Sequence, residues 1–219
     1  MQLSRSSVAA KSVSGLGNVN DLIQKESTPR VGSTAPTISG ESSQTVTARD
    51  LAKMRFKTIG YNGRFKDVVG DPALGFHMMV YGKPFQGKSS FVIELCKDLA
   101  ALKKGRIAYL ALEEGISASM QKKVVDRGAA NVDGLDFLGT MPTSFSGYGF
   151  IVIDSVSDRS IKRETLRELF LQNPQTCFIC IFHATKEGTA RGGLDYSHDM
   201  DIILKIERHA ASVEKNRFL

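Results

Sequence analysis

The chain has 219 residues, of which 42% are hydrophobic and 24% are charged, and its formal net charge is +6 at pH 7. This length suits one domain with a full core and excludes two large folded domains. The sequence has no run of about eighteen apolar residues and no apolar leader, so we expect a cytoplasmic protein without a membrane partner. The basic excess permits a polyanionic partner but does not require one.

Residues 1–46 are rich in Ser, Thr and Gly and show little hydrophobic periodicity. Such a segment buries too little apolar surface to offset the entropy lost on ordering, so we expect a flexible tail that binds another protein. Residues 47–50 have the pattern of a helix start, because Thr47 stands three positions before Asp50. The sequence therefore predicts a tail over 1–46 and one folded domain over 47–219.

A glycine-rich octapeptide at 82–89 matches the pattern G-x-x-x-x-G-K-[ST]. It follows the apolar run 76–81 and precedes an amphipathic stretch, so its context is strand, loop and helix. The N–H groups of such a loop and of the following helix bind phosphates, and a chance match on a glycine-rich turn is the alternative. We expect ATP to bind Gly82, Lys83, Pro84, Phe85, Gln86, Gly87, Lys88, Ser89 and Ser90.

Two side chains of this loop have the chemistry of nucleotide hydrolysis. Lys88 reaches the β- and γ-phosphate oxygens, and the Ser89 hydroxyl is placed to ligate Mg²⁺. The apolar run 150–153 ends in Asp154, whose carboxylate would hold the same Mg²⁺ through a water. Many buried strands end in Asp, so the motif at Asp154 is weak evidence alone. It becomes strong evidence because the octapeptide at 82–89 precedes it.

Strand and helix patterns alternate along the rest of the chain. We expect strands at 106–112, 135–138, 150–154, 176–182 and 200–206, and helices at 116–128 and 163–171. This alternation predicts an α/β fold, a mainly parallel sheet with helices on both faces and ligands at the carboxyl ends of the strands. Cys96, Cys177 and Cys180 lie in apolar contexts, so we expect buried thiols instead of disulfides or a metal site.

Five sequence features occur in the order and spacing typical of one ATPase family. They are the octapeptide at 82–89, the pair Glu113-Glu114, the strand end Asp154-Ser155, the stretch His-Ala-Thr-Lys-Glu-Gly at 183–188, and Lys-Asn-Arg-Phe at 215–218. Together they resemble the RecA-like ATPases, most closely the bacterial RadA (Sms) proteins and less closely the DnaB-type helicases. The resemblance covers residues 56–219 and implies the RecA-like fold. Leu219 stands where that family usually has glycine.

The resemblance also implies roles for residues outside the phosphate loop. Glu113 stands where the family keeps the carboxylate that orients the attacking water, with Glu114 as a surface residue; a solvated acidic strand end is the alternative. His183 takes the position of a γ-phosphate sensor, although a lone histidine is also commonly a packed structural residue. Lys215 and Arg217 correspond to a cationic finger in a neighbouring subunit's site, and a frayed basic C-terminus is the alternative. We therefore expect a homo-oligomer, a hexameric ring or a filament.

Two basic loops occupy the positions where the RecA-like fold carries its DNA-facing loops. The first contains Arg159, Lys162 and Arg163, and the second contains Lys186 and Arg191. Neither loop has the aromatic side chains of a protein that recognises base sequence. We therefore expect salt-sensitive binding of DNA, chiefly single-stranded, without sequence specificity. A solvated helix end is the alternative for the first loop.

Two classes of function remain. The first is a DNA-dependent ATPase that acts in recombination, repair or replication. The second is a nucleotide-switched assembly or structural protein, KaiC-like in character, that uses the fold without motor activity. Stimulation of ATP hydrolysis by DNA separates the two classes.

Overall fold

The structure is a computed structural model that describes residues 45–157, 161–190 and 193–219. Residues 1–44 of the expected tail lie outside this part of the chain. The contacts within the chain divide it after Leu51. Helix α1 (Ala48–Leu51) precedes this division and contributes no buried residue. Its start is the predicted one, because the Thr47 hydroxyl accepts a hydrogen bond from the Asp50 N–H at 3.2 Å.

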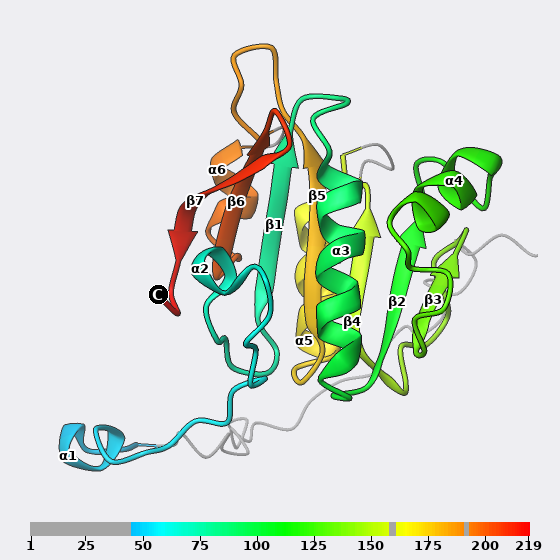
Figure 1. The fold of residues 1–219 in the computed structure, drawn as a ribbon. Coiled ribbons are helices and arrows are strands. Elements are labelled where there is room, and N and C mark those ends of the chain that lie inside the picture. Colours follow the sequence, from blue (N-terminus) through cyan, green and yellow to red (C-terminus); the bar gives the residue numbers. More distant parts are fainter. Residues whose placement is uncertain (1–44, 158–160, 191–192) are drawn as a thin grey trace, which may run out of the picture. The chain divides into compact units, whose positions relative to one another are not determined.

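One sheet of seven strands organises the described part of residues 52–219 (Figure 1). The strands are β1 (His77–Gly82), β2 (Arg106–Ala111), β3 (Leu135–Leu138), β4 (Tyr148–Asp154), β5 (Cys177–His183), β6 (Ile202–Glu207) and β7 (Ala210–Asn216). Their order across the sheet is β3-β2-β4-β5-β1-β6-β7, and every neighbouring pair is parallel except β6 with β7. The predicted mainly parallel α/β sheet is confirmed.

Helices cover both faces of this sheet (Figure 1). The helices are α2 (Lys66–Val69), α3 (Lys88–Ala101), α4 (Ala118–Asp126), α5 (Arg163–Gln172) and α6 (Gly193–Ser197). Side chains of α2, α3 and α4 share one core with Met78 and Val80, whereas those of α5 and α6 pack with Met79 and Tyr81. Because successive residues of a strand point to opposite faces, the continuous apolar strands supply both cores.

The three cysteines lie in these cores as free thiols. Cys96 and Cys177 belong to the core under α3, and Cys180 belongs to the core under α5. The Cys177 and Cys180 side chains therefore face opposite ways, because residues three positions apart on a strand lie on opposite faces. Burial raises the pKa of Cys177 to about 11, which keeps its thiol protonated at neutral pH.

The helices in the described ranges were also compared with the length and hydropathy of a membrane span. None of them is both long enough and apolar enough to cross a bilayer.

Candidate functional site

Four neighbouring parallel strands, β2, β4, β5 and β1, end at the same edge of the sheet. A cavity of about 400 Å³ lies at this edge, within the usual size range for a small-molecule site. The predicted site residues that line it are Pro84, Phe85, Gly87, Lys88, Ser89, Ser90, Glu113, Asp154 and His183. Residues from the phosphate loop and from three further strand ends are thus brought together.

The loop between β1 and α3 turns sharply before the helix begins. Gly87 has φ 93° and precedes the first helical residue, Lys88. This left-handed backbone favours glycine, and a Cβ at Gly87 would lie 2.5 Å from the His209 Nδ1 atom. Because Lys88, Ser89 and Ser90 line the cavity, the unpaired N–H groups and the positive end of the α3 dipole face it.

Phe85 is a second left-handed position of this loop. It has φ 61°, and the residue is 96% exposed. A bulky residue in this region costs about 1–2 kcal/mol, and such strain is typical of functional loops. The phosphate loop therefore holds Phe85 in a backbone conformation that this residue rarely adopts.

The Lys88 side chain folds back over the loop. Its Nζ donates a hydrogen bond to the Lys83 carbonyl oxygen at 3.0 Å, and the residue is 7% exposed. Burial lowers the pKa of Lys88, although the carboxylates of Asp154 and Glu113 oppose this. A carbonyl does not neutralise a buried ammonium, so an anionic ligand would stabilise it further.

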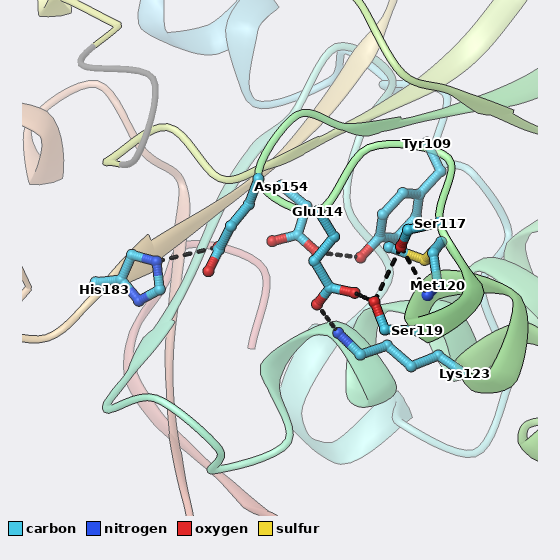
Figure 2. Close-up of polar contacts among 9 residues, drawn as sticks. Tyr109, Glu114, Ser117, Ser119, Met120, Lys123, Asp154 and His183 are labelled. Carbon is cyan, nitrogen blue, oxygen red and sulfur yellow. Dashed lines mark hydrogen bonds and ion pairs between the residues drawn. The ribbon is translucent and has the colours of Figure 1, made fainter.

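Asp154 lies at the end of β4 and is 4% exposed. The Tyr109 hydroxyl, from the adjacent strand β2, donates a hydrogen bond to Asp154 Oδ2 at 2.5 Å (Figure 2). Burial raises the pKa of Asp154, and the hydrogen bonds from Tyr109 and Ser89 counteract part of this rise. The contact with Ser89 places the predicted hydroxyl and carboxylate ligands of Mg²⁺ side by side.

The side chains present fit Mg²⁺ that arrives with a nucleotide. Mg²⁺ commonly binds one or two protein oxygen ligands and completes its shell with waters and substrate phosphates. Within the described ranges, no group of three or more His, Cys, Asp and Glu side chains is arranged to hold a metal ion. Ser89 and Asp154 therefore match a metal held jointly by protein and phosphate.

Glu113 and His183 are in direct contact although Glu113 follows β2 and His183 is the last residue of β5. Glu113 Oε2 lies 3.1 Å from His183 Nε2, and the side chains are 35% and 13% exposed. The Glu113 N–H donates to the Asp154 carbonyl oxygen at 2.9 Å, which fixes the carboxylate beside the end of β4. His183 Nδ1 is buried without a hydrogen-bond partner among the described residues. The two predicted residues thus form one unit at the cavity.

The cations predicted to act as a finger lie away from this cavity. β7 runs antiparallel to β6, so Lys215 pairs with Ile203 near the start of β6. Lys215 Nζ donates to the Ser197 and Met200 carbonyl oxygens at 3.0 and 2.5 Å. β7 ends at Asn216, so Arg217 lies beyond the strand that contains Lys215. Their action on a neighbouring subunit stays a prediction.

Arg217 has a partner within its own chain as well. Its Nη1 donates to Asp201 Oδ1 at 2.9 Å, and its side chain is 57% exposed. An exposed ion pair of this kind contributes roughly 0–1 kcal/mol, so the guanidinium is available to a stronger anionic partner.

The cations predicted to bind DNA differ in their surroundings. Arg159 and Arg191 lie outside the described residues, and Lys162 and Lys186 are exposed. Arg163 donates two hydrogen bonds to Asp199, at 2.6 and 3.2 Å, so its charge already has a partner within the chain. Lys186 lies in a small hairpin over residues 184–190, which the Ala184–Ala190 bridge closes.

Four further residues of the cavity were not predicted. They are Glu114, Ser119, Lys123 and His209. The interpretation of Glu114 as a surface residue was wrong, because its carboxylate pairs with Lys123 beside the phosphate loop. The two adjacent acidic residues, Glu113 and Glu114, were the signal available in the sequence. The sequence does not show which helix face Glu114 contacts.

His209 belongs to the turn between β6 and β7, where Arg208 and His209 have φ 48° and 64°. The Arg208 N–H donates to Gln86 Oε1 at 2.6 Å, and the His209 N–H donates to the Gln86 carbonyl oxygen at 3.2 Å. The turn is thereby attached to the phosphate loop. The pair Arg208-His209 is not one of the Asn-Gly, Asp-Gly or Gly-Gly pairs typical of such turns, so no clear signal for this turn was present in the sequence.

Comparisons with known proteins support the fold. No protein-family model matches the sequence, and no curated protein matches it. Among solved structures, 475 chains match. One is a KaiC-like protein from the hyperthermophilic archaeon Pyrococcus horikoshii, with a TM-score of 0.53 and 15% sequence identity over 74% of this chain and 89% of that chain. At this identity the likeness shows the fold alone. The predicted RecA-like fold is confirmed, and the closer resemblance to RadA and DnaB-type proteins stays a prediction.

Proposed function

We propose that this chain binds ATP with Mg²⁺ and hydrolyses the nucleotide as a RecA-type P-loop ATPase. One observation carries the proposal: a single cavity is lined by Lys88, Ser89, Glu113 and Asp154. A cation, a metal-binding hydroxyl, a carboxylate for water and a carboxylate for the metal are the groups that phosphoryl transfer to water needs. Lys88 and Ser89 come from the phosphate loop and the start of α3, whereas Glu113 follows β2 and Asp154 ends β4, so the convergence does not depend on the loop motif alone.

In this proposal the residues act by positioning and by charge. The N–H groups of the phosphate loop and the Lys88 ammonium hold the β- and γ-phosphates. Ser89 and Asp154 would hold Mg²⁺, which would neutralise charge on the phosphates. Glu113 orients the attacking water and accepts its proton, and the contact with His183 Nε2 fixes the direction of that carboxylate.

We further propose that the ATPase acts on DNA in recombination, repair or replication, as RadA-like proteins do, and that it assembles as a homo-oligomer. The exposed side chains of Lys162 and Lys186 support DNA binding, because they follow strands β4 and β5, which end at the cavity. Such cations neutralise backbone phosphates without reading bases.

The test of the hydrolytic function is Lys88→Ala, measured as release of inorganic phosphate from ATP. We expect turnover to be abolished, because the γ-phosphate loses a cation in a site that solvent screens poorly. Lys97→Ala is the matched control, since Lys97 lies on the same helix and bonds to the Arg127 carbonyl oxygen away from the cavity. Wild-type turnover in the Lys88 variant would exclude the proposed ATPase.

A second candidate function is a nucleotide-switched assembly protein without motor activity. The pairing of Arg163 with Asp199 favours it, because that pair removes one of the cations expected to face DNA. Single-stranded DNA should raise the rate of hydrolysis at low salt if the first function is right. A rate that DNA does not change, together with an oligomeric state that ATP does change, supports the second.

A further inference from the structure

A second lysine, Lys123, reaches the same cavity from helix α4. Its Nζ forms an ion pair with Glu114 Oε1, and Figure 2 shows the side chain extending from the helix to that carboxylate. Glu114 Oε2 also accepts a hydrogen bond from Ser119 Oγ at 2.8 Å. Ser119 and Lys123 are four residues apart, so they share one face of α4. That face presents a cation, held by a carboxylate, to the phosphate loop.

The backbone that carries Lys123 is fixed, whereas its side chain has room to move. Ser117 caps the helix by accepting a hydrogen bond from the Met120 N–H at 3.3 Å. The Met120 side chain is buried in the core under α3, with 3% exposure. The Lys123 side chain is 30% exposed. A change of partner by the ammonium therefore needs a rotation of the side chain and no movement of α4.

Lys123 and Lys88 both line this cavity. Lys88 is 7% exposed, and the Lys123 side chain is 30% exposed. Two ammonium groups that repel each other across one cavity both gain from a polyanion bound between them.

Glu114 is a suitable partner for the cavity without nucleotide. Burial disfavours its ionised form, but the hydrogen bonds from Lys123 and Ser119 outweigh this and hold the pKa of Glu114 below its ordinary value. The carboxylate is therefore ionised at neutral pH and neutralises Lys123. Glu114 also follows Glu113 directly, so the pair is anchored at the strand end that carries the residue proposed to orient water.

We propose that Lys123 is a second phosphate-binding cation of this cavity, which Glu114 holds in the free protein and which moves to the terminal phosphate of a bound nucleoside triphosphate. The inference rests on the proposed nucleotide-binding function and adds a contact that distinguishes triphosphate from diphosphate. Exchange of a carboxylate for a phosphate keeps the ammonium paired throughout, and Glu114, whose side chain is 27% exposed, keeps the hydrogen bond from Ser119 and its contact with solvent.

The test compares the affinities of the full chain for a non-hydrolysable ATP analogue and for ADP, both with Mg²⁺. Lys123→Ala should weaken binding of the analogue about tenfold or more, since a charge-assisted hydrogen bond is lost, and should change ADP binding less than about twofold. Glu114→Gln should tighten binding of the analogue, because it removes the competing partner of Lys123. Lys123→Arg should restore most of the affinity.

Lys122→Ala is the matched control. Lys122 precedes Lys123 on α4, its side chain is 75% exposed, and it pairs with Asp126. This variant should bind both nucleotides as the wild type does. Lys123→Met keeps the aliphatic stem and replaces the alanine variant if thermal unfolding shows that the latter is not folded.

The outcomes separate this inference from the function on which it rests. If the analogue binds in a Lys88-dependent manner while Lys123→Ala binds it as Lys122→Ala does, Lys123 is not a phosphate ligand and the ATPase proposal stands. If Lys123→Ala and Glu114→Gln weaken both nucleotides equally, the ion pair is structural and the inference is wrong. If the wild type binds no nucleotide, the proposed function fails first.

Discussion

The carboxyl edge of the sheet and the end of β7 both carry charged residues, but their charges have different surroundings. At the edge, Lys88 bonds to a carbonyl and Glu113 contacts His183, and both side chains line a cavity of about 400 Å³. At the end of β7, Lys215 donates to two carbonyl oxygens and Arg217 pairs with Asp201. The first group surrounds space for a ligand, whereas the second is engaged by its own chain. A charged motif alone does not distinguish these two situations.

The largest expected effect tests whether the end of β7 also serves catalysis, through a neighbouring subunit. We expect Arg217→Ala to lower turnover about 10³-fold or more, because a cationic finger neutralises charge in the transition state. Mixing this variant with Lys88→Ala should restore activity at boundaries where an intact phosphate loop meets an intact finger. Phosphate release from the mixture and from each variant alone measures this.

Asp201→Asn is the control for that experiment, because it weakens the ion pair and leaves the Arg217 guanidinium in place. A finger requires that this variant keep its turnover. A mixture no more active than either parent, although both variants assemble, would assign Arg217 to the structure of its own chain.

The second prediction tests the role of Glu113 at the cavity. Glu113→Gln should lower kcat by roughly 10²–10⁴, because an amide of the same size does not accept the proton of the attacking water. Nucleotide affinity should stay close to that of the wild type, since the amide oxygen still accepts a hydrogen bond from His183 Nε2. Equal losses of affinity and turnover would make Glu113 a structural residue.

Much of the fold could be predicted because its signals are local. Buried parallel strands are continuous apolar runs, and β5, which was predicted over residues 176–182, forms over Cys177–His183. Helix α4 is shorter than the predicted 116–128 because Ser117 caps it and it ends at Asp126. The extent of β7 could not be predicted, since most of its residues are exposed and buried residues do not alternate with exposed ones along it.

The residues of the site also divide into those that the sequence could predict and those that it could not. Lys88, Glu113 and Asp154 could be predicted because each stands directly after a strand or loop with its own pattern. Lys123 and His209 could not, because a helix face and a turn bring them to the cavity from elements whose positions only the folded sheet defines. The pairing of Arg163 with Asp199 could not be predicted from the sequence either, since the two residues are 36 positions apart.

The smallest expected effect concerns Tyr109, which connects the cavity edge to the core beneath it. Burial raises the pKa of Tyr109 well above its ordinary value, so the hydroxyl stays protonated and donates to Asp154. Tyr109→Phe removes this bond and keeps the ring against Phe137, whose centroid lies 4.9 Å away. Hydrogen bonds to metal-binding carboxylates commonly change metal affinity about tenfold, so half-maximal turnover should need about ten times more Mg²⁺.

The pH dependence gives the same variant a second measurement. Loss of the Tyr109 hydrogen bond raises the pKa of Asp154 further, so at limiting Mg²⁺ activity should begin to fall at a higher pH as the solution is acidified. At saturating Mg²⁺, kcat should stay within about twofold, because Asp154 acts through the metal. Tyr148→Phe is the matched control, since Tyr148 bonds to Asp136 at the opposite end of β4. Coinciding Mg²⁺ titrations of the two variants would show that Tyr109 only packs the core and does not position Asp154.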